Sequence, residues 1–162
     1  MLKQFSHRLI QVKNADSIIA EGAAIVDALG MQPTLARDID VVLSDGKPLT
    51  IFKRGTYAIP EQCNRDMRFY CTDNRDGRAY IVVGESRGRV GQIHGIKTIL
   101  PIPISAELPK PFNAERVETN FRVDEDIILH ISGKGATKEK GNRCEIYDLC
   151  FGMSVPEVED GI

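Results

Sequence analysis

The sequence predicts a mainly β protein, a β-sandwich preceded by one helix. From Asp40 onward, apolar and polar residues alternate with a period of two, as in strands that bury one face. Turn-forming runs, such as Asp45-Gly46 and residues 72–77, separate the alternating stretches at the spacing typical of all-β sandwiches. Only the segment before Gly30 has apolar residues at helical spacing. These three observations set the expected fold class.

We expect residues 1–30 to contain one helix, at about residues 16–29. Its apolar positions recur at helical spacing: Ile18, Ile19, Ile25, Val26 and Leu29. Gly30 follows the last of them, where a left-handed residue commonly ends a helix. One helix cannot bury a core alone, so this segment is expected to belong to a larger domain or to dock elsewhere. Its apolar face also suggests self-association of the chain.

Residues 31–37 are expected to form a linker, with Pro33 ending the helix. The β-sandwich is then expected over residues 38–153, followed by a tail over residues 154–162. Its strands are expected at about residues 40–43, 49–53, 67–71, 79–83, 96–104, 117–123, 127–132 and 144–151. Pro101 and Pro103 favour an edge or bulged position for their strand, because proline cannot donate to a ladder.

Composition and charge exclude several classes of function. A formal net charge of -2 provides no basic field for nucleic acid, and no apolar run approaches the roughly 18 residues that span a bilayer. The four cysteines form no CxxC pair, so a zinc site is not expected. We expect them to be free thiols in a reducing cytoplasm. The basic residues within 134–143 indicate a solvated hairpin loop.

No catalytic constellation is expected, and the chain is interpreted as a non-enzyme. The run Gly84-Glu85-Ser86-Arg87-Gly88 matches GxSxG literally, but a nucleophile elbow requires a strand, a turn and then a helix. Here the sequence after Ser86 indicates a loop. A serine hydrolase that uses Ser86 is kept as one alternative interpretation. His130 lies within a predicted strand, which favours a partly buried structural histidine.

Four segments in one order carry a further signal. Residues 14–24 read NADSIIAEGAA and resemble the last helix of a nucleotide-binding domain. Residues 53–60 resemble a loop that precedes a third strand, and the hairpins within 72–85 and 117–134 resemble two later hairpins of the same kind of protein. Together, over roughly residues 8–151, they resemble the seventy-kilodalton heat-shock protein family, the DnaK-type chaperones.

This resemblance implies that the chain is the substrate-binding β-domain of a stress-response chaperone, which holds extended apolar polypeptides. It implies that residues 1–30 are the end of a nucleotide-binding domain, and that ATP hydrolysis resides in the missing part of that domain. No cofactor is expected in this chain. The implied partners are unfolded polypeptides and co-chaperones, and the implied location is the cytoplasm.

The resemblance also implies a set of peptide-binding residues, in a pocket between the first hairpin and the middle and late strands. They are Val42, Phe69, Cys71, Ala79, Ile81 and Val117. A shift of one residue in the strand near Phe69 would exchange its two faces. Met67 and Tyr70 are therefore substitutes for Phe69.

Two departures from the family pattern bear on function. The segment equivalent to the family's leucine-rich linker, residues 36–41, is shorter and more charged, which puts nucleotide-driven coupling in doubt. The tail 154–162 stands where a helical lid begins in the family, so we expect peptide to leave quickly and to bind weakly. The alternative interpretation is a non-catalytic structural or regulatory β-sandwich that docks a dedicated protein partner.

Overall fold

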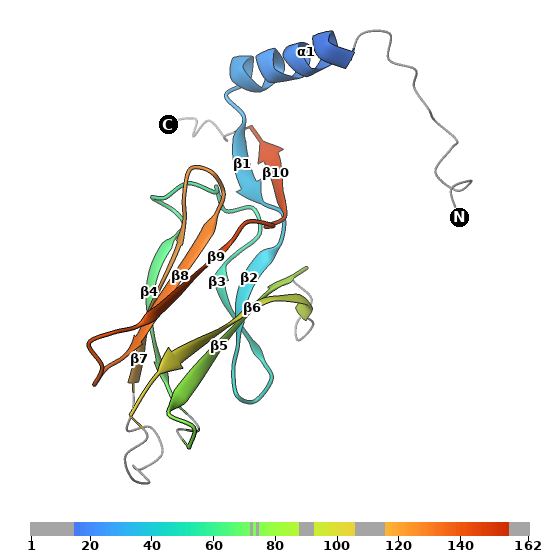
Figure 1. Cartoon of the computed structure of the whole chain (residues 1–162). Helices are drawn as coiled ribbons and strands as arrows, with labels where there is room; N and C mark the ends of the chain where they lie inside the picture. The colour runs from blue at the N-terminus through green and yellow to red at the C-terminus, as the bar shows by residue number, and fades with distance from the viewer. Residues whose placement is uncertain (1–14, 72, 74, 88–92, 106–115, 156–162) are drawn as a thin grey trace, which may run out of the picture. The chain divides into compact units, whose positions relative to one another are not determined.

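The computed structural model describes residues 15–71, 73, 75–87, 93–105 and 116–155 of the chain (Figure 1). Within them the fold is mainly β, with one helix and ten strands. The chain divides into two units, which are described separately. One comprises residues 33–154, and the other comprises residues 1–32 and 155–162.

The helix α1 spans Ala15–Ala28, which confirms the predicted helix to within one residue at each end. Gly30 adopts the predicted left-handed conformation, with φ of 58°. The N–H of Met31 donates to the carbonyl oxygen of Val26 at 2.9 Å, and that of Gly30 donates to Asp27 at 3.0 Å. This paired arrangement is a Schellman motif. The isoleucine side chains of α1, Ile18, Ile19 and Ile25, are exposed, with Ile19 at 72%.

Eight strands form two four-stranded sheets in which neighbours are antiparallel. The first sheet has the order β3-β2-β5-β6, with β2 at Asp38–Val42, β3 at Pro48–Phe52, β5 at Arg78–Ser86 and β6 at Ile93–Pro103. The second has the order β4-β7-β8-β9, with β4 at Asn64–Tyr70, β7 at Arg116–Val123, β8 at Leu129–Gly135 and β9 at Asn142–Ile146. The short strands β1 (Gln32–Leu35) and β10 (Phe151–Ser154) pair with each other (Figure 1).

The two four-stranded sheets share one hydrophobic core. Every second residue of β7, from Val117 to Val123, is buried, and β8 alternates in the same way. The sheets pack closely beside Gly133 of β8, where an added Cβ would lie 2.3 Å from Cδ1 of Ile102 on β6. The period-two pattern of the sequence therefore corresponds to one face buried between the sheets.

Two local predictions are confirmed in detail. The hairpin between β2 and β3 turns at Gly46, whose φ is 79°, and the N–H of Leu43 donates to Lys47 at 2.9 Å. Strand β6 is the edge of its sheet and contains a register shift opposite Val83 and Gly84. An edge strand with a bulge tolerates the prolines that prompted the prediction.

Two boundaries differ from the prediction. Residues 31–37 are not only a linker, because strand β1 lies within them and pairs with β10. The single closing strand expected at 144–151 is wrong, since β9 ends at Ile146 and β10 begins at Phe151. In each case the deciding partner is distant in sequence, so local alternation could not reveal it. Residues 1–14 and 156–162, which include most of the expected tail, lie outside the described residues.

Candidate functional site

A cavity of about 630 Å³ lies where strand ends of both sheets meet. Its walls come from the end of β2, the β2–β3 hairpin, the last residues of β4 and the beginnings of β5 and β7. Antiparallel pairing brings these ends together. Val42 of β2 stands opposite Val82 of β5, and Tyr70 of β4 stands opposite Arg116 of β7.

All six residues predicted for peptide binding line this one cavity: Val42, Phe69, Cys71, Ala79, Ile81 and Val117. They differ in how much surface they offer. Ala79, Ile81 and Val117 are buried, with exposed fractions of 8%, 5% and 1%. The other three are partly exposed. The structure therefore brings the predicted set together, but half of it belongs to the floor and the core.

The register of β4 decides between Phe69 and its two substitutes. Phe69 pairs with the buried Val117 and packs against the core. Met67 lies on the same face but lines a different cavity. Tyr70 points the other way and is 53% exposed. Phe69 is thus the inward-facing aromatic residue of this cavity, and Tyr70 stands at its rim.

Sequence reasoning missed two of the most accessible apolar groups of the rim. Tyr80 and Leu43 both line the cavity and are 50% and 37% exposed. The Tyr80 hydroxyl donates to Asp76 at 2.8 Å, while the guanidinium of Arg116 lies 5.8 Å from the centre of the Tyr70 ring. An aromatic residue at an outward position between Ala79 and Ile81 was the signal that could have identified Tyr80.

The rim carries charges of both signs around an apolar floor. Hydrogen bonds from Lys47, first from its backbone N–H and then from its ammonium group, lower the pKa of Asp45. Hydrogen bonds from the Arg75 side chain and backbone lower the pKa of Asp73 to about 2. Both carboxylates are therefore ionised near neutral pH, and each has a cation beside it. Cys71 donates through Sγ to the carbonyl oxygen of Asp73 at 2.9 Å.

Neither Ser86 nor His130 lines this cavity. Ser86 is the last residue of β5 and is 5% exposed. His130 of β8 has its Nε2 2.6 Å from Oδ2 of Asp124 and its Nδ1 3.5 Å from Oε1 of Glu145. Asp124 also accepts the N–H of Ile128 at 2.9 Å. These contacts tie the turn after β7 to β8 and β9, which is a structural role for His130.

No protein-family model matches the sequence. Within the described residues, no group of three or more His, Cys, Asp or Glu side chains is arranged to hold a metal ion. Nor does that part of the chain contain a helix long and apolar enough to cross a membrane.

Proposed function

We propose that this chain is the peptide-binding module of a molecular chaperone, and that it resembles the substrate-binding β-sandwich of DnaK-type chaperones. The observation that carries the proposal is the assembly of the cavity. Six residues chosen through that resemblance are scattered between positions 42 and 117, yet all of them line one cavity at the strand ends. The mainly antiparallel β fold is also the kind that the resemblance implies.

The cavity suits an extended chain with one or two apolar side chains. Its volume of about 630 Å³ falls within the range of roughly 300–1,000 Å³ for small-ligand sites. A peptide would insert a side chain against Phe69 and Val42, while Tyr70 and Tyr80 would cover the peptide backbone at the rim. Peptide recognition commonly combines backbone hydrogen bonds with pockets for selected side chains.

On this proposal the chain binds and performs no chemistry of its own. ATP hydrolysis resides in a nucleotide-binding domain of which residues 1–30 are the end, so no cofactor is needed here. Unfolded polypeptides are the substrates, and the module works with co-chaperones in the cytoplasm. Because three of the six predicted peptide-binding residues are almost inaccessible, they add little contact area and the affinity should be modest.

Fluorescence anisotropy with a labelled heptapeptide tests the proposal. A peptide with central leucines should bind in the micromolar to millimolar range, and one with central serines should not. Tyr70→Ala and Tyr80→Ala each remove a half-exposed rim residue, so each should weaken binding several-fold without unfolding the protein. Tyr147→Ala is the matched control, because Tyr147 is 69% exposed and does not line the cavity.

The proposal is rejected if the leucine peptide does not bind at about 1 mM, near the weak end of useful affinity. Equal losses for all three tyrosine variants would also reject this cavity as the site. Either result would favour the alternative, a non-catalytic β-sandwich that docks a dedicated protein partner. Exposed Ile96 and Ile99 on β6, at 61% and 54%, favour it as a second candidate.

A further inference from the structure

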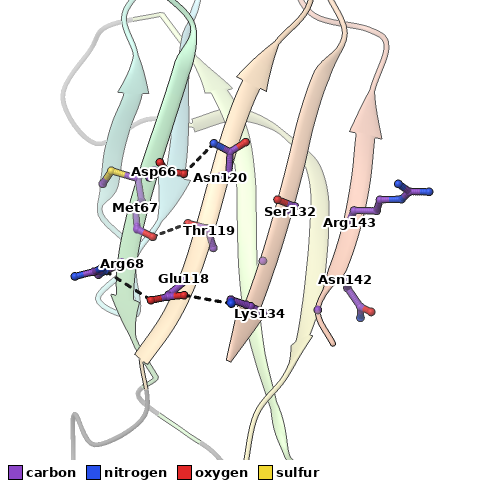
Figure 2. A pocket seen from close by; sticks show the side chains of 12 residues that line it. Asp66, Met67, Arg68, Glu118, Thr119, Asn120, Ser132, Lys134, Asn142 and Arg143 are labelled. Carbon is purple, nitrogen blue, oxygen red and sulfur yellow. Dashed lines mark hydrogen bonds and ion pairs between the residues drawn. The ribbon is translucent and has the colours of Figure 1, made fainter. Parts of the chain in front are cut away.

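A second cavity opens on the sheet β4-β7-β8-β9 (Figure 2). Its volume is about 630 Å³, and residues of all four strands line it. Gly133 and Gly141 line it near the β8–β9 hairpin. A Cβ on Gly141 would lie 2.2 Å from the carbonyl oxygen of Gly133. Position 141 therefore cannot carry a side chain unless the hairpin moves.

A row of polar side chains crosses this cavity from strand to strand. Asn120, Ser132 and Arg143 stand opposite one another on β7, β8 and β9. Lys134 follows Ser132 by two residues and so lies on the same face of β8. Lys134 and Arg143 are thus diagonal neighbours, roughly 7 Å apart at the backbone. Their long side chains can reach one carboxylate or two adjacent ones.

The basic side chains that line this cavity form only long ion pairs, or none, with the described acidic residues. Glu118 lies between Arg68, at 3.8 Å, and Lys134, at 3.7 Å (Figure 2). Long ion pairs between exposed groups stabilise a protein very little, so Lys134 can turn to a ligand at small cost. Arg143 is exposed and forms no ion pair with another described residue. Two cations are therefore available for an outside anion.

The loop beside the cavity adds to this positive charge. Lys138 and Lys140 are exposed in the connection between β8 and β9, with the exposed Glu139 between them. Neither lysine forms an ion pair within the described part of the chain, and the three residues together carry one net positive charge. The whole chain has a formal net charge of -2. The gathering of cations at this hairpin is therefore a local feature and does not reflect a generally basic surface.

We propose that this cavity, together with the β8–β9 loop, binds an extended acidic segment of a partner protein. Its carboxylates would pair with Arg143 and Lys134, and its backbone would bond to Ser132 and Asn120. Charged side chains recognise carboxylates by charge-assisted hydrogen bonds, for which the guanidinium of Arg143 is well suited. Arg68 lines both this cavity and the one at the strand ends, but the cations that bind the acidic segment belong to this site alone, and the inference does not depend on the proposed chaperone function.

The sheet also limits the length and polarity of the segment. Four strands about 4.8 Å apart span roughly 14 Å, which about four extended residues can cross. Acidic residues are favoured only over β8 and β9. Over β4 and β7 they would meet Asp66 and Glu118, so neutral residues are expected there.

Anisotropy with the full chain and a labelled, end-capped tetrapeptide of two adjacent glutamates and two glutamines, the pattern that the sheet favours, tests this assignment. The double variant Lys134→Gln/Arg143→Gln should bind it about fivefold more weakly, in line with the small energy of exposed ion pairs. A matched control, Lys53→Gln/Arg87→Gln, removes the same charges from exposed positions that do not line this cavity and should leave binding unchanged. Arg68 is kept native because it lines both cavities.

Weaker binding in the first double variant alone, together with weaker binding of the native chain at high salt, would support the site. Equal losses in the two double variants would overturn it, as would equal binding of tetraglutamine or no binding at about 1 mM. Complete displacement by excess inorganic phosphate would show a general anion site and also overturn it. The leucine heptapeptide should bind both double variants like the native chain, so failure of one proposal is distinguishable from failure of the other.

Discussion

The carboxylate of Glu85 accepts a hydrogen bond from the backbone N–H of Cys150, with 2.8 Å between Oε1 and N. This bond joins the end of β5 to the connection between β9 and β10. The other oxygen, Oε2, lies 3.4 Å from Nζ of Lys97 and 3.5 Å from Nη1 of Arg37. Glu85 is only 1% exposed, so these partners compensate for the burial of its charge.

Replacing Glu85 with alanine should lower the free energy of unfolding by roughly 1–3 kcal/mol, because it leaves the Cys150 N–H without its acceptor. Lys97 keeps its ion pair with Asp148 at 2.8 Å. Urea denaturation measures the change. Glu125→Ala is the control, since Glu125 is exposed in the turn after β7, and it should change stability by less than about 0.5 kcal/mol. Similar values for the two variants would show that Glu85 does not anchor this connection.

Gly141→Ala should destabilise the β8–β9 hairpin by roughly 1–3 kcal/mol, the usual penalty of overpacking. The added Cβ would meet the backbone of Gly133, which cannot move aside as a flexible side chain could. Gly95→Ala serves as a control because its Cβ would meet nothing within 4 Å. Thermal unfolding of both variants checks the prediction, and a native-like Gly141→Ala would contradict the close approach at this hairpin.

The bond between Asp124 and His130 should make stability depend on pH at the acidic end. Hydrogen bonds from His130 first, and then from the N–H of Ile128, lower the pKa of Asp124. A carboxyl with a lowered pKa in the folded state stabilises the fold above its unfolded pKa of about 3.9, and this contribution is lost as the pH falls through the folded pKa.

Asp124→Asn should accordingly be less stable than the native chain at pH values near neutral. The difference should shrink as the pH falls below about 4. Urea unfolding at a series of pH values measures it. A constant difference down to the acid limit would mean that the charge of Asp124 does not contribute to folding.

The exposed apolar face of α1 should drive weak, concentration-dependent association of the chain. Ile19 and Ile25 are 72% and 56% exposed, and apolar patches of this kind favour contact with another molecule. Ile19→Lys/Ile25→Lys should abolish the association in sedimentation velocity, whereas Glu21→Lys, on the same helix, should preserve it. A native chain that stays monomeric at all concentrations would disprove this expectation.

The features that local sequence predicts well are those decided by neighbouring residues. Gly30 ends the helix and Gly46 turns the first hairpin because both positions require a left-handed backbone. Pro101 and Pro103 mark an edge strand because neither can donate to a partner. Each of these signals lies within a few residues of the feature it specifies.

Features that depend on distant partners were not predictable. Strand β1 pairs with β10, which lies more than 100 residues later in the chain. The residues of Gln32–Leu35 alone do not indicate that partner. The bond between Glu85 and Cys150 likewise joins residues far apart in the chain. For the candidate site, the resemblance indicated six residues that line one cavity. The period-two pattern indicated the inward face for all of them except Val42, which pairs with the outward Val82. Neither could indicate depth, so the near-complete burial of Val117 and the exposure of Tyr80 were not foreseen.

Two-dimensional ¹H–¹⁵N spectra recorded during titration with the leucine heptapeptide test the chaperone proposal most directly. We expect saturable shifts at the amides of Val42, Phe69 and Tyr80, with no comparable change at Ser132 or Arg143. Spectra that stay unchanged up to about 1 mM peptide, or shifts centred on any other surface, would contradict it.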